Sequence, residues 1–185
     1  MRLFVALELG ETVRAAVRDL IGRLQRARAD LRWARPEGMH LTLKFIGEVP
    51  EAKLEPIRAA LGGVTSPKPV TLEFRDLGYF PTERRPRVLW VGIQASDNLA
   101  PLATQLEAAL EPLGIEREER DYVPHLTLGR FKSPKRADKL QEEIAALPST
   151  EFGRIETGEF FLFQSKLSPA GAQYTKLERF PFVRS

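Results

Sequence analysis

The sequence predicts a mixed α+β fold built from two similar halves that meet at one cleft. Three observations support this prediction: helical and strand-type segments alternate along the 185 residues, the tetrapeptide His-Leu-Thr-Leu occurs twice, and similar elements surround each copy. The two copies, His40–Leu43 and His125–Leu128, contain both histidines of the chain. Such a duplication would place the two motif strands around a pseudo-two-fold axis. We expect a single domain, 1–185, with lobes of approximately 1–86 and 87–185 that are free to exchange strands.

The first half has a clear order of elements. Apolar and polar residues alternate in its strands, and Val13, Val17 and Leu20 recur at helical spacing. The helix that follows the first motif stops at Gly62. The pattern predicts a strand over 2–9, a helix over 11–28, the first histidine strand over 38–46, a helix over 51–61 and a strand over 70–77.

The second half approximately repeats this order. A turn-rich stretch, 81–86, leads into it, and Gly114 ends its first helix. Ser133 is a candidate cap for its second helix, with Pro134 at the first helical position. Residues 168–171 form the last turn. The pattern predicts a strand over 88–93, a helix over 99–113, the second histidine strand over 122–131, a helix over 134–147 and strands over 155–167 and 173–180.

Composition excludes several classes of protein. The chain has no cysteine, and therefore no disulfide, thiolate nucleophile or cysteine-bound metal. No apolar run approaches the length of a membrane span, and the N-terminus lacks a signal-peptide pattern, so we expect a soluble, cytoplasmic monomer. The formal net charge of +3 is ordinary, but the cluster Arg84-Arg85-Pro86-Arg87 is a local basic loop able to meet a polyanion.

The two motifs place an imidazole and a hydroxyl on the same side of a strand. Side chains alternate along a strand, so His40 and Thr42 point to one face while the two leucines of the motif point to the other. His125 and Thr127 repeat this arrangement. Histidine both gives and takes a proton near neutral pH, because its ordinary pKa is about 6.5. Two of them in twin settings indicate an acid and a base.

Other interpretations of these residues fit less well. A lone histidine on a strand is commonly structural, but the duplication on a shared face favours function. A catalytic zinc normally takes three protein ligands, and here Asp121 or Glu48 would have to join the two histidines. The chain lacks a nucleophile elbow for a serine triad and a Walker-type phosphate loop. We therefore expect neither a metal nor a cofactor.

Two imidazoles and two hydroxyls suit in-line displacement at a phosphodiester. The reaction needs a base for the attacking oxygen and an acid for the departing one, on opposite sides of phosphorus. Threonine hydroxyls can stabilise the charge that develops on the non-bridging oxygens. A strained 2′,3′-cyclic phosphate is a suitable substrate. The rival interpretation is a non-catalytic module that binds RNA or nucleotides in the same cleft.

The chain resembles a known family. The twin motifs, the opening segment 1–9 and Phe45-Ile46-Gly47 are similar to those of the two-histidine phosphoesterases, specifically the 2′-5′ RNA ligase or RNA 2′,3′-cyclic phosphodiesterase family. The resemblance implies a bilobal fold with antiparallel sheets facing a central cleft, helices packed outside, and no metal. It also implies opening of cyclic phosphates on RNA ends or cyclic nucleotides to 2′-phosphates, with 2′-5′ ligation as the reverse reaction.

The resemblance also suggests roles for individual residues. It makes His40 the proton donor and His125 the proton acceptor, although composition alone does not distinguish the motifs. Tyr122 and Arg130 resemble positions that could stack on a nucleobase. Strict alternation puts Arg130 on the face opposite His125, unless the strand twists or bulges. Apart from the resemblance, alternation along the strand puts Lys44 on the face of His40, where it could approach phosphate; the alternative is an exposed lysine at the end of the strand.

Overall fold

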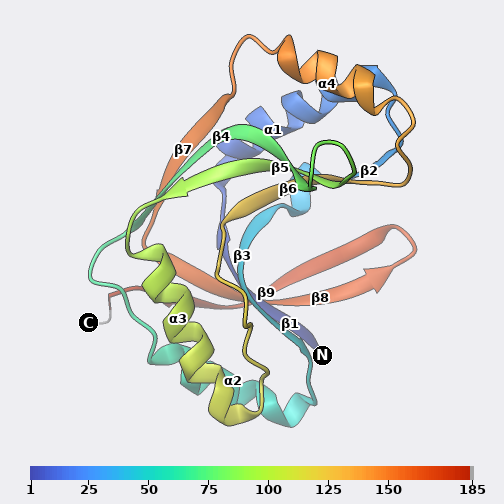
Figure 1. Ribbon diagram of the computed structural model, residues 1–185. Helices are drawn as coiled ribbons and strands as arrows, with labels where there is room; N and C mark the ends of the chain where they lie inside the picture. Colours follow the sequence, from blue (N-terminus) through green and yellow to red (C-terminus); the bar gives the residue numbers. More distant parts are fainter. Residues whose placement is uncertain (184–185) are drawn as a thin grey trace.

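The strands of the chain form two antiparallel sheets that meet near β3 and β6 and diverge from there (Figure 1). The computed structural model describes residues 1–183. The four-stranded sheet has the order β3 (His40–Glu48), β1 (Arg2–Glu8), β8 (Glu159–Ser168) and β9 (Gly171–Pro181). The five-stranded sheet has the order β2 (Leu31–Trp33), β6 (His125–Phe131), β5 (Pro86–Ala95), β4 (Val70–Pro81) and β7 (Glu151–Thr157).

The two sheets repeat one arrangement and exchange strands. The order β3-β1-β8-β9 corresponds to β6-β5-β4-β7, with a motif strand at the first position of each series. β4 from the first half pairs with β5, and β8 from the second half pairs with β1. Each sheet therefore contains strands from both sides of residue 86. The duplicated α+β architecture with antiparallel sheets is as predicted.

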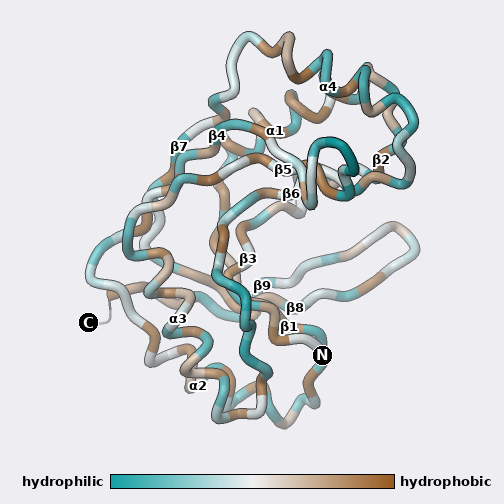
Figure 2. The backbone as a smooth tube through the Cα atoms, viewed as in Figure 1, coloured by the Kyte–Doolittle hydropathy of each residue, from teal (hydrophilic) through white to brown (hydrophobic). Residues whose placement is uncertain are grey.

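Helices cover the outer faces of the sheets. α1 (Gly10–Leu24) contacts β7 and α4 (Ala137–Ala145) beside the five-stranded sheet, while α2 (Leu54–Gly62) and α3 (Leu99–Leu110) pack together and against the strands of the other. The apolar stripe of each helix is buried with the leucines and valines that alternate along the strands. By contrast, residues 116–121 before β6 are continuously hydrophilic (Figure 2).

Two strand predictions were wrong. The single strand expected over 155–167 is two strands, β7 and β8, which break at Gly158 and lie in different sheets. A periodic apolar pattern on both sides of one glycine does not reveal that the chain changes sheet. The short strand β2 was not expected, and the second histidine strand begins at His125 instead of residue 122.

The predicted cap of the last helix was also wrong. α4 begins at Ala137, after Arg136 in a left-handed conformation with φ of 60°. The Ser133 hydroxyl instead donates to the Asp30 carboxylate at 2.7 Å. Ser133 and Pro134 thus belong to the loop that joins β6 to the helix. Within the described residues, no helix has the length and apolar character needed to cross a membrane.

The same substitution should have opposite effects at two glycines. A Cβ on Gly78 would lie 2.1 Å from the Trp90 ring, whereas a Cβ on Gly22 in α1 would meet nothing within 4 Å. We expect Gly78→Ala to lower the free energy of unfolding by about 1–3 kcal/mol through overpacking. Gly22→Ala should raise it by about 0.5–1 kcal/mol through helix propensity. Urea titrations of both variants check this, and equal shifts of the same sign would contradict it.

Candidate active site

β3 presents His40 and Thr42 on the face away from the main core. Leu41 and Leu43, which alternate with them, are only 2% and 5% exposed, whereas His40 and Thr42 are half-buried. Pairing with β1 fixes the register, with Thr42 opposite Ala6. The predicted sharing of one face by imidazole and hydroxyl is therefore present in this strand.

His40 lies in an aromatic cage. Its ring stacks on Phe4 at 4.6 Å and on Phe163 at 5.5 Å between centroids, and the ring of Tyr174 meets it edge-on at 5.0 Å. Burial lowers the pKa of His40 to about 4, the backbone carbonyl of Gly38 opposes this by accepting a hydrogen bond, and the positive charge of Arg14 lowers the pKa further. The imidazole of the free site is thus neutral at pH 7.

β6 presents His125 and Thr127 in the same way. The His125 Nδ1 lies 2.9 Å from the Val123 carbonyl oxygen. A carbonyl oxygen only accepts hydrogen bonds, so Nδ1 is the donor, and in the neutral form of the ring Nε2 is the acceptor. The Phe80 ring contacts His125 edge-on at 5.1 Å. Trp90 is the cross-strand partner of Thr127 and packs against Phe80 at 5.2 Å. The second histidine thus also has aromatic neighbours, from β4 and β5.

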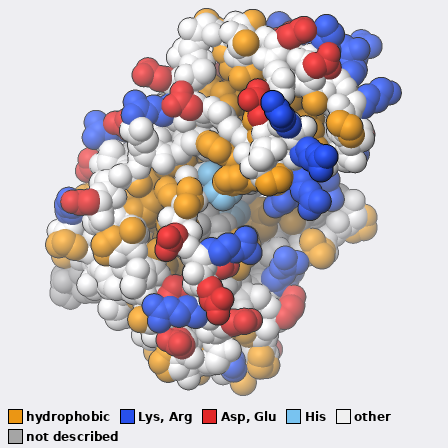
Figure 3. Space-filling model, viewed as in Figure 1, with side chains coloured by type: hydrophobic (Ala, Val, Ile, Leu, Met, Phe, Trp, Pro, Cys, Tyr) orange, Lys and Arg blue, Asp and Glu red, His pale blue; other side chains and the backbone are white. Residues whose placement is uncertain are grey.

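The two motif strands are linked directly. The Tyr122 hydroxyl, three residues before His125, donates to the backbone carbonyl of Thr42 at 3.0 Å. The Tyr122 ring packs against the core, and burial raises the pKa of its phenol above the ordinary value of 10.0. This placement favours a positioning role for Tyr122 over stacking on a base. Histidine atoms lie in a hollow between the two lobes (Figure 3).

The predicted position of Lys44 was wrong. The pairing of β1 with β3 shifts register between Thr42 and Lys44, so the alternation of side chains is interrupted after the motif. Lys44 is 6% exposed, and its Nζ donates to the Glu107 carboxylate at 2.8 Å and to the Glu116 carbonyl at 2.6 Å. It is a buried ion pair that joins β3 to α3, on the side away from His40.

A matching irregularity has the opposite consequence for Arg130. The pairing of β5 with β6 shifts register between Thr127 and Gly129. Arg130 then lies opposite Val88. Val88 and Trp90 are two residues apart and lie on the same face of β5, and Trp90 is the partner of Thr127. Arg130 therefore lies on the same face as His125 and Thr127. The equivalent position after the first motif is Phe45, which is 67% exposed.

Sequence reasoning missed the aromatic walls of the hollow. The alternation of apolar and polar residues could have predicted which face of its strand each ring occupies. It could not predict the contacts, because most of them join strands that are distant in sequence. Pairings of the motif strands and their neighbours, including β1 with β3 and β8, β8 with β9, and β4 with β5, bring most of these rings to the histidines. The residues concerned are Phe4, Phe45, Phe80, Trp90, Phe163 and Tyr174.

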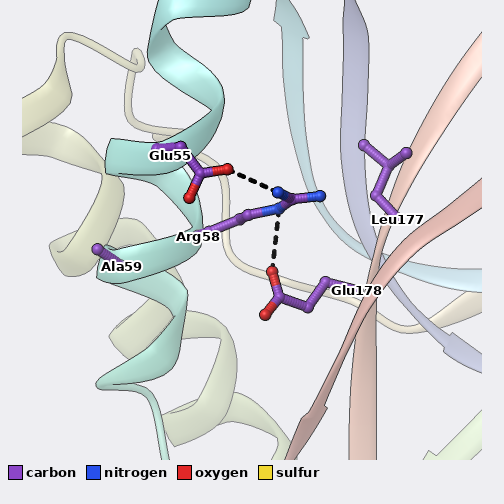
Figure 4. A pocket seen from close by; sticks show the side chains of 5 residues that line it. All are labelled: Glu55, Arg58, Ala59, Leu177 and Glu178. Carbon is purple, nitrogen blue, oxygen red and sulfur yellow. Dashed lines mark hydrogen bonds and ion pairs between the residues drawn. The ribbon is translucent and has the colours of Figure 1, made fainter.

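Other parts of the described structure are weaker candidates for a catalytic or metal-binding site. Over residues 1–183, no cluster of three or more His, Asp or Glu side chains could hold a metal ion. A cavity of about 540 Å³ lies between α2 and β9, away from the motif strands (Figure 4). Its guanidinium, Arg58, already pairs with Glu55 at 2.6 Å and with Glu178 at 3.0 Å. The charged groups of this cavity therefore compensate one another.

A duplicated antiparallel fold with one His-x-Thr strand from each repeat at a common hollow defines a two-histidine phosphoesterase. The profile of the LigT-like phosphoesterases matches residues 7–90 and again residues 91–174. The chain therefore belongs to the LigT-like phosphoesterase family, and the two matches coincide with the two repeats.

Relatives of this family cover almost the whole chain. The chain is 39% identical to an RNA 2′,3′-cyclic phosphodiesterase of Methanothermobacter thermautotrophicus, over 97% of this chain and 98% of the relative. Among solved structures, a protein of Thermus thermophilus is 34% identical with a TM-score of 0.79, covering 98% of each chain. LigT of E. coli in complex with 3′-AMP is 26% identical with a TM-score of 0.78, covering 99% of this chain and 98% of LigT.

The burial of His40 should make the folded protein sensitive to acid. Its folded pKa of about 4 lies below the ordinary 6.5, so between these values the unfolded chain binds a proton that the folded protein does not. The free energy of unfolding should therefore fall as pH drops through this window, by up to about 3 kcal/mol at about 1.4 kcal/mol per pKa unit. Urea titrations of the wild type and His40→Gln, from pH 7.5 to 4.5, measure the difference. Parallel pH dependences for the two proteins would contradict it.

Proposed function

We propose that this protein opens 2′,3′-cyclic phosphates at RNA ends by metal-independent acid–base catalysis, with His40 as proton donor and His125 as proton acceptor. The observation that carries the proposal is the hollow at which β3 and β6 each present an imidazole and a hydroxyl. The names of the relatives support the same substrate class. We further propose, as the sequence led us to expect, that the protein acts as a monomer in the cytoplasm.

The proposed reaction is one in-line displacement at phosphorus. Nε2 of His125 takes a proton from water while the water oxygen forms a bond to phosphorus. The bond from phosphorus to the ribose 3′-oxygen breaks, and His40 gives its proton to that oxygen. The products are a 3′-hydroxyl and a 2′-phosphate, and the two imidazoles have exchanged protonation states. Transfer of protons through solvent restores them.

Neighbouring groups stabilise the negative charge of the transition state. In residues 1–183, neither threonine hydroxyl of the motifs has a hydrogen-bond partner in the protein, so both are free to donate to the non-bridging oxygens. Arg130 lies on the same face and offers a guanidinium to the phosphate or a plane for stacking. The exposed Phe45 ring supplies a surface for a nucleobase on the other side of the hollow.

The same groups would run the reaction backwards. A 5′-hydroxyl that enters along the path of water would be activated by His125 and would form a 2′-5′ linkage, with His40 again protonating the 3′-oxygen. The alternative function is a module that binds RNA or nucleotides without turnover. Two histidines favour the enzyme, since lysine or arginine would suffice to hold a phosphate.

Removal of either imidazole should abolish most of the activity. We expect His40→Ala and His125→Ala each to lower kcat by about 10²–10⁴-fold, the usual contribution of a general acid or base. Thr42→Val and Thr127→Val should cost less, because each removes only one hydrogen bond to the developing charge. Ring opening of a cyclic-phosphate-ended oligonucleotide, assayed in EDTA, measures these rates. A folded histidine variant with near-normal turnover would disprove the pairing, and a need for divalent metal would favour a metal site.

The bond that breaks provides a separate test. With His40 on the side of the 3′-oxygen, in-line geometry requires that phosphate stays on the 2′-oxygen, because the leaving group lies opposite the attacking water. Phosphorus NMR of the product against authentic 2′- and 3′-phosphates distinguishes the two outcomes. A predominant 3′-phosphate would reverse the orientation of the ribose and leave the two-histidine chemistry in place.

A further inference from the structure

The geometry points to a second binding surface for the RNA strand itself, formed by Arg32 on β2 and by Arg84 and Arg85 in the loop between β4 and β5. This inference rests on the proposed function, and it adds a surface on which the RNA strand beyond the reacting nucleotide binds. We call these three residues the arginine track. The track would hold phosphates of the strand outside the reacting nucleotide.

The arginines of the track carry uncompensated charge. All three are exposed, and within residues 1–183 none forms an ion pair or donates a side-chain hydrogen bond. Some exposed arginines elsewhere do have acidic partners, including Arg154 with Glu73 and Arg179 with Glu159. Within residues 1–183, Arg2, Arg26 and Arg28 are also exposed without an acidic partner, so the track is distinguished by its position beside the active site.

A row of cross-strand partners connects the track to the active site. Arg32 lies opposite Arg130, Arg130 opposite Val88, and Val88 opposite Phe80. The Phe80 ring touches His125, and the loop that carries Arg84 and Arg85 starts after the next residue. Basic side chains accordingly gather along one margin of the hollow that contains the histidines (Figure 3).

The pairing of Arg32 with Arg130 is unfavourable for the protein alone. Like charges directly opposite each other on neighbouring strands are destabilising, and no described carboxylate pairs with either guanidinium. An anionic ligand across both strands would remove this repulsion. A phosphodiester backbone is such a ligand, since it repeats its charge along its length and accepts the fork of donors that arginine offers. The aromatic rings beside the row would leave bases room to stack.

The test compares two substrates on one enzyme. The substrates are 2′,3′-cyclic AMP and an oligoadenylate of about ten nucleotides that ends in a 2′,3′-cyclic phosphate, a length that spans an ordinary single-strand site. The variant is Arg32→Gln/Arg84→Gln/Arg85→Gln. We expect its KM for the oligonucleotide to rise by about tenfold or more near physiological salt, with kcat/KM for the mononucleotide unchanged within about twofold. The slope of log KM against log salt should fall by about 2, for three phosphate contacts at about 0.7 each.

A matched control removes the same charge from other faces. Lys68→Gln/Arg154→Gln/Arg179→Gln neutralises three exposed cations on β7, β9 and the segment before β4, which lie away from the motif strands. If the control and the track variant lose oligonucleotide affinity equally, the loss comes from net charge alone and the proposal of a track is disproved. Equal loss of both substrates in a folded track variant would also overturn it, as would no loss at all.

The assay distinguishes an incorrect arginine track from an incorrect proposed function. If the wild type opens neither substrate, the proposed function fails. If it opens both substrates equally well at low salt, the function stands and the track is disproved. Urea titration of Arg32→Gln checks the folded state, and we expect its free energy of unfolding to equal or exceed that of the wild type, because one like-charge pair is removed.

Discussion

The site depends on the exchange of strands between the two repeats. β1 and β3 of the first repeat do not form a sheet with β4; they share a sheet with β8 and β9, while β4 belongs to the sheet of β5 and β6. Each motif strand therefore lies in a sheet that contains strands of both repeats. The β1–β8 and β4–β5 ladders join strands of the two repeats within each sheet, and the hydrogen bond from Tyr122 to the Thr42 carbonyl links the two motif strands.

The exchange also supplies the surroundings of each histidine. Phe163 of β8 reaches His40 because β8 lies beside β1, and Phe80 of β4 reaches His125 because β4 lies beside β5. A duplicated fold with separate lobes would give each motif neighbours from its own repeat only. Here the second repeat shapes the environment of the first histidine, and the first repeat shapes that of the second.

A register shift follows each motif, and the residues that it turns toward the hollow differ between the two halves. The segments His-Leu-Thr-Leu-Lys-Phe and His-Leu-Thr-Leu-Gly-Arg are equivalent, and each is irregular just after the threonine. The shift sends Lys44 into an ion pair and brings Phe45 to the hollow in one strand. In the other strand it brings Arg130 to the hollow, so the pseudo-symmetric site has an apolar side and a cationic side.

These shifts also explain which residues could be predicted from the sequence. The motif faces follow from strict alternation over four residues, and the duplicated order of elements predicts the fold class. Beyond the threonines the alternation ends, so Lys44 and Arg130 both lie on faces that simple alternation does not give. The change of sheet at Gly158 leaves no periodic signal, and the aromatic walls depend on pairings between distant strands.

Burial disfavours the charged form of His40 in the free protein. The rings around His40 lower its pKa to about 4, so the proposed acid is neutral in the free protein at pH 7. A cyclic phosphate carries a negative charge, and its arrival beside the ring favours the protonated imidazole and raises the pKa. In the proposed reaction, substrate and the catalytic proton would therefore bind together at His40. The cage that disfavours charge in the empty site is what ties the acid form of His40 to the presence of phosphate.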